Sequence, residues 1–218
     1  MALGVVVGMA AEARIARALR AVVTIGGGTS GGAEMAAESL AAAGASGLLS
    51  FGLAGGLDPA LLPGALLVPR AVRAFGQSWQ ADPGLLALLG GPTVELMLSE
   101  GRIVASAVAK RRLWQTTRAA AVDVESGAVA EAASRHALPF AVLRTVCDPA
   151  SRSLPPAALT ALGPAGRVRP WRFLAMTLGH PAQLGALFAL ASDARSARLA
   201  LTERVRVLGP SLVLGDNG

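Results

Sequence analysis

Short apolar runs of strand length alternate with helical patterns in the first quarter of the chain. The apolar runs cover residues 3–7, 21–25 and 47–51, and the helical patterns between them cover residues 11–19 and 33–43. Strands that alternate with helices predict a parallel or mixed sheet with helices on its faces. In such sheets, ligands bind beyond the carboxyl ends of the strands.

The rest of the chain continues this pattern less regularly. Further strands are predicted at residues 65–72, 93–98, 102–107, 122–124 and 140–147, helices at 83–89 and 126–136, and a helical pattern with glycine breaks after residue 156. No internal repeat and no long linker separates the chain into parts. Residues 1–218 are therefore predicted to form a single α/β domain, with helices flanking a mixed central β-sheet.

Composition narrows the class of protein. Of the 218 residues 53% are hydrophobic and 16% are charged, which supports a packed core and excludes disorder. Cys147 is the single cysteine, and the two histidines, His136 and His180, do not form a paired zinc motif. We therefore expect no disulfide, no metal and no redox cofactor.

The net charge of +6 is unevenly distributed. Residues 1–109 carry six basic and seven acidic side chains, whereas residues 110–218 carry fourteen and seven. Because the arginines are scattered, aromatic residues make up only 4% and tyrosine is absent, we expect no nucleic-acid partner. Residues 110–112 and 167–172 are the two clusters that could bind a phosphate or a lipid headgroup, although short basic runs usually form solvated surface.

Two features bear on membranes. The N-terminus has no basic region before its apolar run and reaches Glu12 early, so we expect no signal peptide and a cytoplasmic protein. The uncharged stretches 39–57 and 173–192 contain glycines or polar residues that disfavour a spanning helix. The helix predicted at residues 171–191 packs in the core or against a second subunit, or else lies on the inner membrane together with the 167–172 cluster.

The glycine-rich segment after the second strand matches two motifs incompletely. Residues 26–31 fit G-x-G-x-x-G, but no acidic residue ends the next strand, which argues against a dinucleotide site. Residues 28–32 fit G-x-S-x-G, yet Ser30 follows only the second strand, too early for a nucleophile elbow. The remaining interpretation is that these glycines let backbone amides approach a ligand or allow close packing.

Three carboxylates, Glu12, Glu125 and Asp148, stand at predicted strand ends among apolar residues. Capping of a helix is the structural explanation, and it suits Glu125 best because a helix is predicted to begin beside it. Capping suits Asp148 less well, since Pro149 follows. Acids that converge on one edge of a sheet indicate a catalytic site.

Four segments together resemble a known family. They read GVVVGMAAEA, SFGLAGGLDPALLPGALLVP, AVDVESGAVA and PFAVLRTVCD, and span about residues 3–155. In this order they resemble the purine and uridine phosphorylase superfamily, which includes methylthioadenosine/S-adenosylhomocysteine nucleosidases. The SFGLAGGLDP form, the V-E-S-G-A variant and the GHPAQL segment are most similar to hopanoid-associated phosphorylases, proposed to remove adenine from adenosylhopane in hopanoid biosynthesis.

The resemblance implies an enzyme that cleaves an N-glycosidic bond and releases adenine. Asp148 matches the family's general acid at purine N7, and Glu12 matches the carboxylate that activates water. Arg144 matches the arginine of the family pattern V-R-A-I-S-D. The turn at Leu53, Ala54 and Gly55 is expected to line the substrate site through backbone groups.

Two departures from the nucleosidase pattern affect substrate binding. The family reads V-E-M-E-A where we align Val124-Glu125-Ser126-Gly127-Ala128, so Gly127 replaces the second glutamate that grips ribose. Ribose contacts are then expected from Glu125 and Ser126. The loop with an aromatic that stacks on adenine looks shortened at residues 106–110. A bulky apolar substituent on the substrate would compensate for both losses.

The nucleophile and the exact class are left open. Glu12 favours water over a phosphate dianion, whereas Gly27, Gly28 and Ser30 could bind phosphate as a co-substrate through backbone amides. The alternatives are a methylthioadenosine/S-adenosylhomocysteine or futalosine nucleosidase and, in another class, a non-catalytic nucleoside- or lipid-binding protein. The resemblance also implies a homo-oligomer that binds a small adenosyl substrate.

Overall fold

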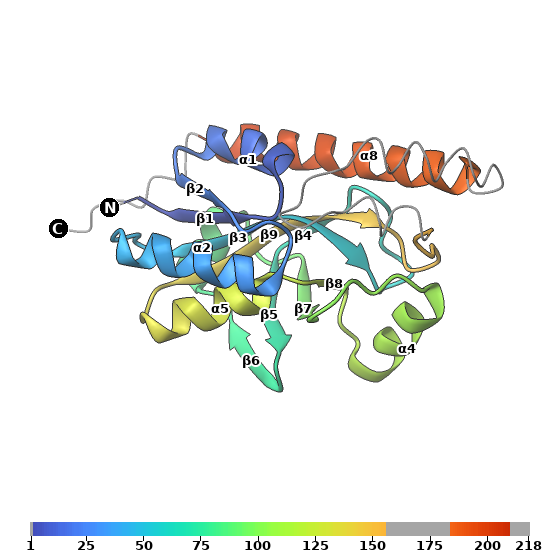
Figure 1. Cartoon of the computed structure of the whole chain (residues 1–218), viewed down its shortest axis with the longest axis horizontal. Helices are drawn as coiled ribbons and strands as arrows, with labels where there is room; N and C mark the ends of the chain where they lie inside the picture. The colour runs from blue at the N-terminus through green and yellow to red at the C-terminus, as the bar shows by residue number, and fades with distance from the viewer. Residues whose placement is uncertain (1, 156–183, 210–218) are drawn as a thin grey trace.

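A mixed β-sheet runs through the molecule (Figure 1). The computed structural model describes residues 2–155 and 184–209. The strands of this part are β1 (Gly4–Val7), β2 (Val22–Ile25), β3 (Leu48–Gly56), β4 (Leu66–Leu67), β5 (Pro69–Ala74), β6 (Gln77–Gln80), β7 (Val94–Ser99), β8 (Ala121–Asp123) and β9 (Phe140–Asp148). Their order is β2-β1-β3-β8-β7-β5-β6, and β9 pairs with both β3 and β4.

Strand β3 is the centre of the sheet. It runs parallel to β1 and β9 and pairs in antiparallel fashion with β8 through its last residues, Gly55 and Gly56. The register of β3 against β9 shifts between Ala54 and Gly55. Because β1, β3 and β9 are parallel, their carboxyl ends meet at one edge of the sheet.

Helices cover both faces of the sheet (Figure 1). The helices of the described residues are α1 (Ala10–Ala16), α2 (Ser30–Ala42), α3 (Pro83–Leu88), α4 (Ala107–Thr117), α5 (Ser126–Arg135) and α8 (Leu184–Leu208), with a 3₁₀ turn at Arg17–Leu19. Helices α2 and α5 pack together on one face, and α1 and α8 on the other. Each pair buries small or aliphatic side chains against the strands, such as Ala37 and Leu40 of α2 and Leu201 and Val205 of α8. The predicted α/β class is confirmed.

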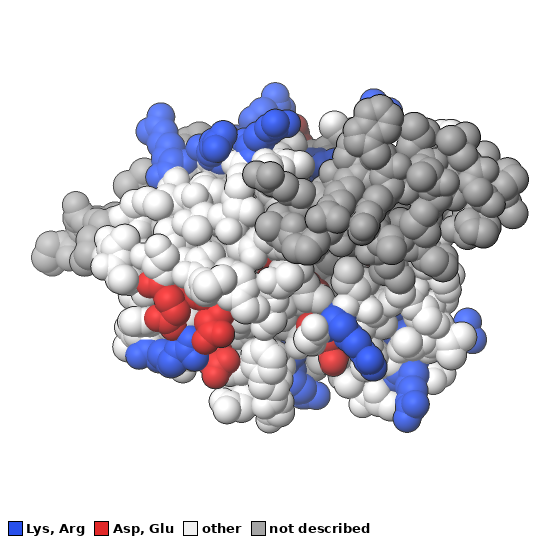
Figure 2. Space-filling model, in the orientation of Figure 1, with Lys and Arg blue, Asp and Glu red and all other residues white. Residues whose placement is uncertain are grey.

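Charged side chains lie mainly outside this core. In Figure 2 acidic and basic side chains gather over α2 and α5, where Arg135 pairs with Glu34 and Glu38. Basic side chains also project from the α1 side, where Arg14 and Arg17 are exposed. Most arginines of the described part therefore form solvated surface, as predicted.

The sequence prediction was wrong at several places, among them the strand predicted at residues 65–72, which is divided into β4 and β5. Residues 102–106 are irregular rather than a strand, and α4, which was not predicted, begins directly after Ser106 caps it. The short apolar run Ile103–Val104 follows β7 and turns into a cavity instead of pairing with a strand. Strand β6 was missed, and β3 extends to Gly56, five residues beyond the predicted end at residue 51.

The prediction for residues 171–191 falls largely outside the described residues, as does the 167–172 cluster. The described end of that range is the first part of α8. None of the helices in residues 2–155 and 184–209 combines the length and the apolar character needed to cross a membrane.

Candidate active site

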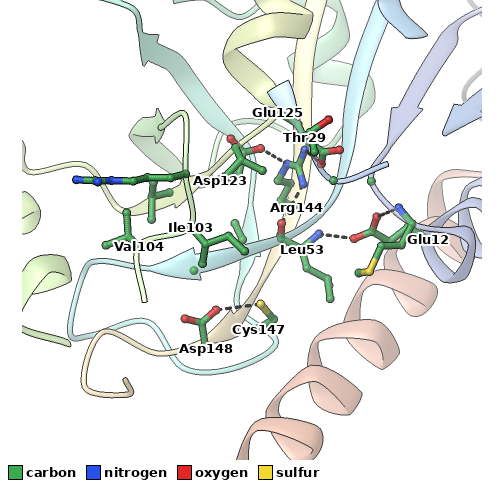
Figure 3. Close-up of a pocket in the computed structure, with 18 of the residues that line it drawn as sticks. Glu12, Thr29, Leu53, Ile103, Val104, Asp123, Glu125, Arg144, Cys147 and Asp148 are labelled. Atoms are coloured by element: carbon green, nitrogen blue, oxygen red, sulfur yellow. Dashed lines mark hydrogen bonds and ion pairs between the residues drawn. The ribbon is translucent and has the colours of Figure 1, made fainter. Parts of the chain in front are cut away.

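A pocket of about 490 Å³ opens at the carboxyl edge of the sheet (Figure 3). Its walls come from β3, β8 and β9 and from the segments that follow β1, β2, β7, β8 and β9. Glu12, Glu125 and Asp148 approach it from different sides. The three carboxylates singled out from the sequence thus line one cavity.

Glu12 is held by backbone amides. It lies in the first turn of α1 and is 3% exposed; Met9 N–H donates to its Oε2 (2.9 Å) and Leu53 N–H to its Oε1 (3.1 Å). Burial raises the pKa of Glu12 from 4.5 to about 7, although the positive charge of Arg144 opposes the shift. A carboxylate that exchanges a proton near neutrality can act as a general base.

Gly52 makes room for this carboxylate. A Cβ at residue 52 would lie 2.5 Å from Glu12 Oε1, and the φ of +146° belongs to a region that L side chains rarely adopt. A glycine is therefore required at residue 52 by the position of Glu12.

Arg144 organises the opposite wall. Its guanidinium is 2% exposed, contacts Asp123 (Nε to Oδ2, 2.6 Å) and Glu125 (3.1 Å), and donates to Leu53 O (2.9 Å) and Ser50 Oγ (2.8 Å). Burial lowers the pKa of Arg144, but Asp123 and Glu125 raise it by more, so the guanidinium stays charged. The arginine fixes two carboxylates and the backbone of Leu53, which in turn donates to Glu12.

The carboxylate of Glu125 has remaining capacity to accept a hydrogen bond. Its Oε2 pairs with Arg144, whereas its Oε1 is buried and has no partner with hydrogen-bond geometry among the described residues. Burial raises the pKa of Glu125; Arg144 is the main opposing influence, and the nearby backbone N–H of Gly28 also lowers it. A Cβ on Gly8 would come within 2.9 Å of this carboxylate. Because a carboxylate oxygen can accept more than one hydrogen bond, this carboxylate can accept from a ligand hydroxyl in addition to the Gly28 amide.

Asp148 is held by a cation. Its Oδ2 accepts from Lys110 Nζ, and its Oδ1 accepts from Cys147 Sγ at 3.0 Å. Burial raises the pKa of Asp148, and Lys110 and Cys147 lower it. Lys110 itself is fully buried, so its predicted place in a surface cluster with Arg111 and Arg112 is wrong. The Lys110 side chain points inward from α4, a helix that was not predicted from the sequence.

Most of the predicted site residues line the pocket. They are Glu12, Gly27, Gly28, Leu53, Ala54, Gly55, Val124, Glu125, Arg144 and Asp148. Ser30 is not among the lining residues, because it already lies in α2, whose N-cap is Thr29. Asp123, Cys147, Arg102 and Ile103 line the pocket and were not predicted; for Asp123 the signal was its spacing two residues before Glu125.

Ser126 is not a lining residue either. Its fully buried hydroxyl donates to Asp123 Oδ2, accepts from Arg144 Nε (3.2 Å) and lies 2.9 Å from Ser50 Oγ. A hydroxyl has one donor and two acceptor positions, and all three are used. The predicted ribose contact of Ser126 is therefore corrected: the residue supports the wall from behind.

The predicted loss of the second ribose glutamate, assigned to Gly127, is also corrected. A Cβ there would lie 2.4 Å from Ala74 Cβ, so a side chain at residue 127 would point between β5 and β7 and away from the pocket. Asp123 and Glu125 are the two acids, two residues apart, that line the pocket. The V-E-M-E-A pattern thus fits residues 122–126, and both of its acidic positions are retained.

Metal binding finds no support in the described part of the chain, where no group of three or more His, Cys, Asp or Glu side chains could hold an ion. The lining offers instead four carboxylates and two arginines. The arrangement can move protons, bind hydroxyl groups and stabilise positive charge.

Comparison with known proteins places the chain in a family. The phosphorylase superfamily matches residues 5–160, well over half of the chain, and the chain belongs to this superfamily. The superfamily assignment from the four sequence segments is confirmed, and with it the expectation of an enzyme of the nucleosidase or phosphorylase kind. No curated protein matches the chain.

Solved structures of low sequence identity share the fold. The 5′-methylthioadenosine/S-adenosylhomocysteine nucleosidase of Neisseria meningitidis, solved with methylthio-immucillin-A, is 18% identical, with a TM-score of 0.66 over 94% of this chain and 98% of that chain. A futalosine hydrolase mutant of Helicobacter pylori is 18% identical, with a TM-score of 0.61 over 69% and 89%. The S-adenosylhomocysteine nucleosidase of Streptococcus pyogenes is 17% identical, with a TM-score of 0.64 over 93% and 95%.

Proposed function

We propose that this protein hydrolyses the N-glycosidic bond of an adenosyl compound and releases adenine. One observation carries the proposal: Glu12 and Asp148, two buried carboxyl groups with raised pKa values, line the same pocket beside the Asp123–Glu125 pair. Cleavage of this bond needs an acid for the leaving base, a base for the nucleophile and acceptors for the ribose hydroxyls. The pocket offers a candidate for each role.

Asp148 is the proposed general acid. Adenine leaves as a neutral base when N7 takes a proton as the C1′–N9 bond breaks. Burial favours the protonated form of Asp148, which is the form that can donate. The ribosyl cation that develops is stabilised by the surrounding carboxylates.

Glu12 is the proposed base for an attacking water. Four lining carboxylates, Glu12, Asp123, Glu125 and Asp148, face only two lining arginines among the described residues. A phosphate dianion would be repelled, which favours hydrolysis over phosphorolysis. Gly27 and Gly28 line the pocket, and their backbone amides could bind phosphate. Phosphate is therefore tested as the alternative nucleophile.

Asp123 and Glu125 are the proposed ribose-binding residues. The buried Oε1 of Glu125 has acceptor capacity left for a ribose hydroxyl, even with the Gly28 amide nearby. Arg144 holds both carboxylates in place.

For the substrate we propose adenosylhopane, on the sequence resemblance to hopanoid-associated phosphorylases. The apolar part of the lining, which includes Met9, Leu53, Ile103, Val104 and Leu154, supports a large apolar 5′ substituent. This substrate would place the enzyme in the cytoplasm at the inner membrane. No metal or redox cofactor enters the proposed reaction.

A methylthioadenosine/S-adenosylhomocysteine or futalosine nucleosidase is the second candidate. The observation in its favour is the complete acidic pair Asp123–Glu125, because a missing ribose carboxylate no longer counts against a small nucleoside. A non-catalytic binding protein is the third, and the raised pKa values of Glu12 and Asp148 argue against it.

The test measures adenine release by mass spectrometry from adenosylhopane in vesicles, methylthioadenosine, S-adenosylhomocysteine and futalosine, with and without phosphate. The wild type should release the base without phosphate, and Asp148→Asn and Glu12→Gln should each lower kcat by about 10²–10⁴-fold. Glu95→Gln, which removes the charge of a carboxylate on the surface, is the matched control and should leave kcat unchanged. Strict dependence on phosphate would reject hydrolysis, and release from none of the compounds would reject the proposed activity.

A further inference from the structure

Lys110 is the only lysine in the chain, and every other member of its 20 lysine and arginine side chains is an arginine. Its neighbours on α4, Arg111 and Arg112, are wholly or partly exposed, whereas Lys110 is 0% exposed. A buried cation is costly unless it is paired and fully hydrogen-bonded. The position of this single lysine therefore needs an explanation.

The ammonium group has a complete set of partners. Besides Asp148 Oδ2, Nζ donates to Pro149 O and Arg152 O, each at 3.1 Å, and Asp148 O lies within 3.5 Å. An ammonium has three protons, so each is used. The geometry holds one oxygen of Asp148, and it brings a full positive charge to the carboxyl group that lines the pocket.

A purely structural tie does not account for this arrangement. The segment after β9 is fastened to the start of α4 without Lys110, since Leu154 N–H donates to Ala105 O (2.8 Å) and Ala107 N–H to Ser153 Oγ (3.0 Å). Arg152 is also paired with Asp193 of α8 at 2.6 Å. Lys110 adds contacts to backbone carbonyls of this segment, and in addition it is the cation that pairs with Asp148.

We infer that Lys110 is a positioning residue that holds Asp148 Oδ2 and stabilises the carboxylate left behind when Asp148 gives its proton to the leaving base. This inference rests on the proposed function. In the step, the O–H bond of Asp148 breaks, the N7–H bond of adenine forms, and the C1′–N9 electron pair leaves with the base. Lys110 keeps its three protons throughout. The attacking water passes its proton to Glu12, and exchange with solvent returns a proton to Asp148.

The charge of Lys110 also sets the strength of the acid. Burial raises the pKa of Asp148, which favours the protonated acid, and Lys110 opposes this rise, which favours release of the proton. Without the cation Asp148 would hold its proton more tightly and donate less readily.

The experiment compares two substrates in the full-length enzyme. One is the adenosyl compound that the wild type cleaves fastest, whose base must be protonated; the other is 4-nitrophenyl β-D-ribofuranoside, whose nitrophenolate leaves without a proton. Lys110→Gln should lower kcat on the adenosyl compound by about 10–10³-fold, leave KM within about threefold, and change kcat on the nitrophenyl riboside by less than about threefold. Lys110→Arg, which keeps the charge, should restore part of the loss.

The ratio of the two kcat values within one variant does not depend on the folded fraction, so a partly unfolded Lys110→Gln still gives an answer. A pH profile is the second readout: loss of the cation should move the alkaline limb of kcat to higher pH, because the pKa of Asp148 rises. An unchanged ratio and an unchanged limb in Lys110→Gln, with an active wild type, would overturn the inference and leave the proposed function standing. A wild type that cleaves neither substrate would reject both.

Discussion

The two proposed catalytic carboxylates are held in opposite ways. Glu12 accepts from two backbone amides and, among the described residues, from no cation. Asp148 is paired with a buried lysine and a thiol. Backbone amides fix a carboxylate without neutralising it, whereas a cation stabilises the charged form directly. The difference matches the work proposed for each group: Glu12 takes a proton and Asp148 gives one.

The two arrangements do not differ in how far along the chain their partners lie. Glu12 accepts from Met9, three residues away, and from Leu53, 41 residues away. Asp148 accepts from its chain neighbour Cys147 and from Lys110, 38 residues away. Each end of the pocket thus depends on local structure and on tertiary packing, and the two ends differ in the charge of the partners.

The largest expected effect concerns Glu12 and the dependence of the free energy of unfolding on pH. The folded-state pKa of Glu12, about 7, lies above its ordinary value of 4.5. A raised carboxyl pKa contributes stability that is complete below pH 4.5 and is lost as the pH rises through 7. A shift of this size corresponds to about 3 kcal/mol.

The free energy of unfolding of the wild type should therefore fall relative to that of Glu12→Gln by up to about 3 kcal/mol between pH 4 and pH 8. Urea denaturation of both proteins at a series of pH values measures the difference. Parallel curves for the two proteins would contradict a raised pKa of the buried Glu12 carboxyl group.

A substitution at Gly52 should displace the Glu12 carboxylate without changing any charge. Gly52→Ala places a Cβ against Glu12 Oε1 and should displace the carboxylate, lowering kcat by about 10–100-fold. The strained φ should also cost about 1 kcal/mol of stability.

Gly76→Ala is the matched control for that variant. Gly76 has a φ of +75° in the turn between β5 and β6, and nothing lies within 4 Å of its Cβ position. It should show a similar loss of stability with unchanged kcat. Equal activity losses in the two variants would mean that strain, and not the position of Glu12, is what matters.

The sequence predicted the two proposed catalytic carboxylates, but not the cation beside Asp148 or the register of the acidic motif. Glu12 and Asp148 were recognisable because each follows an apolar strand, and the edge of a parallel sheet brings such residues together. Lys110 was hidden in a basic run that looks like surface, because the helix that turns it inward has a weak apolar pattern. Gly127 was misassigned because two overlapping registers of the acidic motif fit the sequence, and only the packing of Gly127 against Ala74 distinguishes them.

The smallest effect belongs to the thiol beside Asp148. Burial raises the pKa of Cys147 well above its usual range, so the group remains an S–H donor to Asp148 Oδ1 at neutral pH. A thiol is a weak donor compared with an ammonium group. Cys147→Ala should therefore lower kcat less than about tenfold and move the alkaline limb only slightly upward, whereas Cys147→Ser, which keeps a donor, should stay close to the wild type. The pH profiles of kcat for these two variants and Lys110→Gln check the order. If Cys147→Ala moved the limb further than Lys110→Gln, the thiol rather than the lysine would govern the acid, and the contrast between the two ends of the pocket would no longer rest on charge.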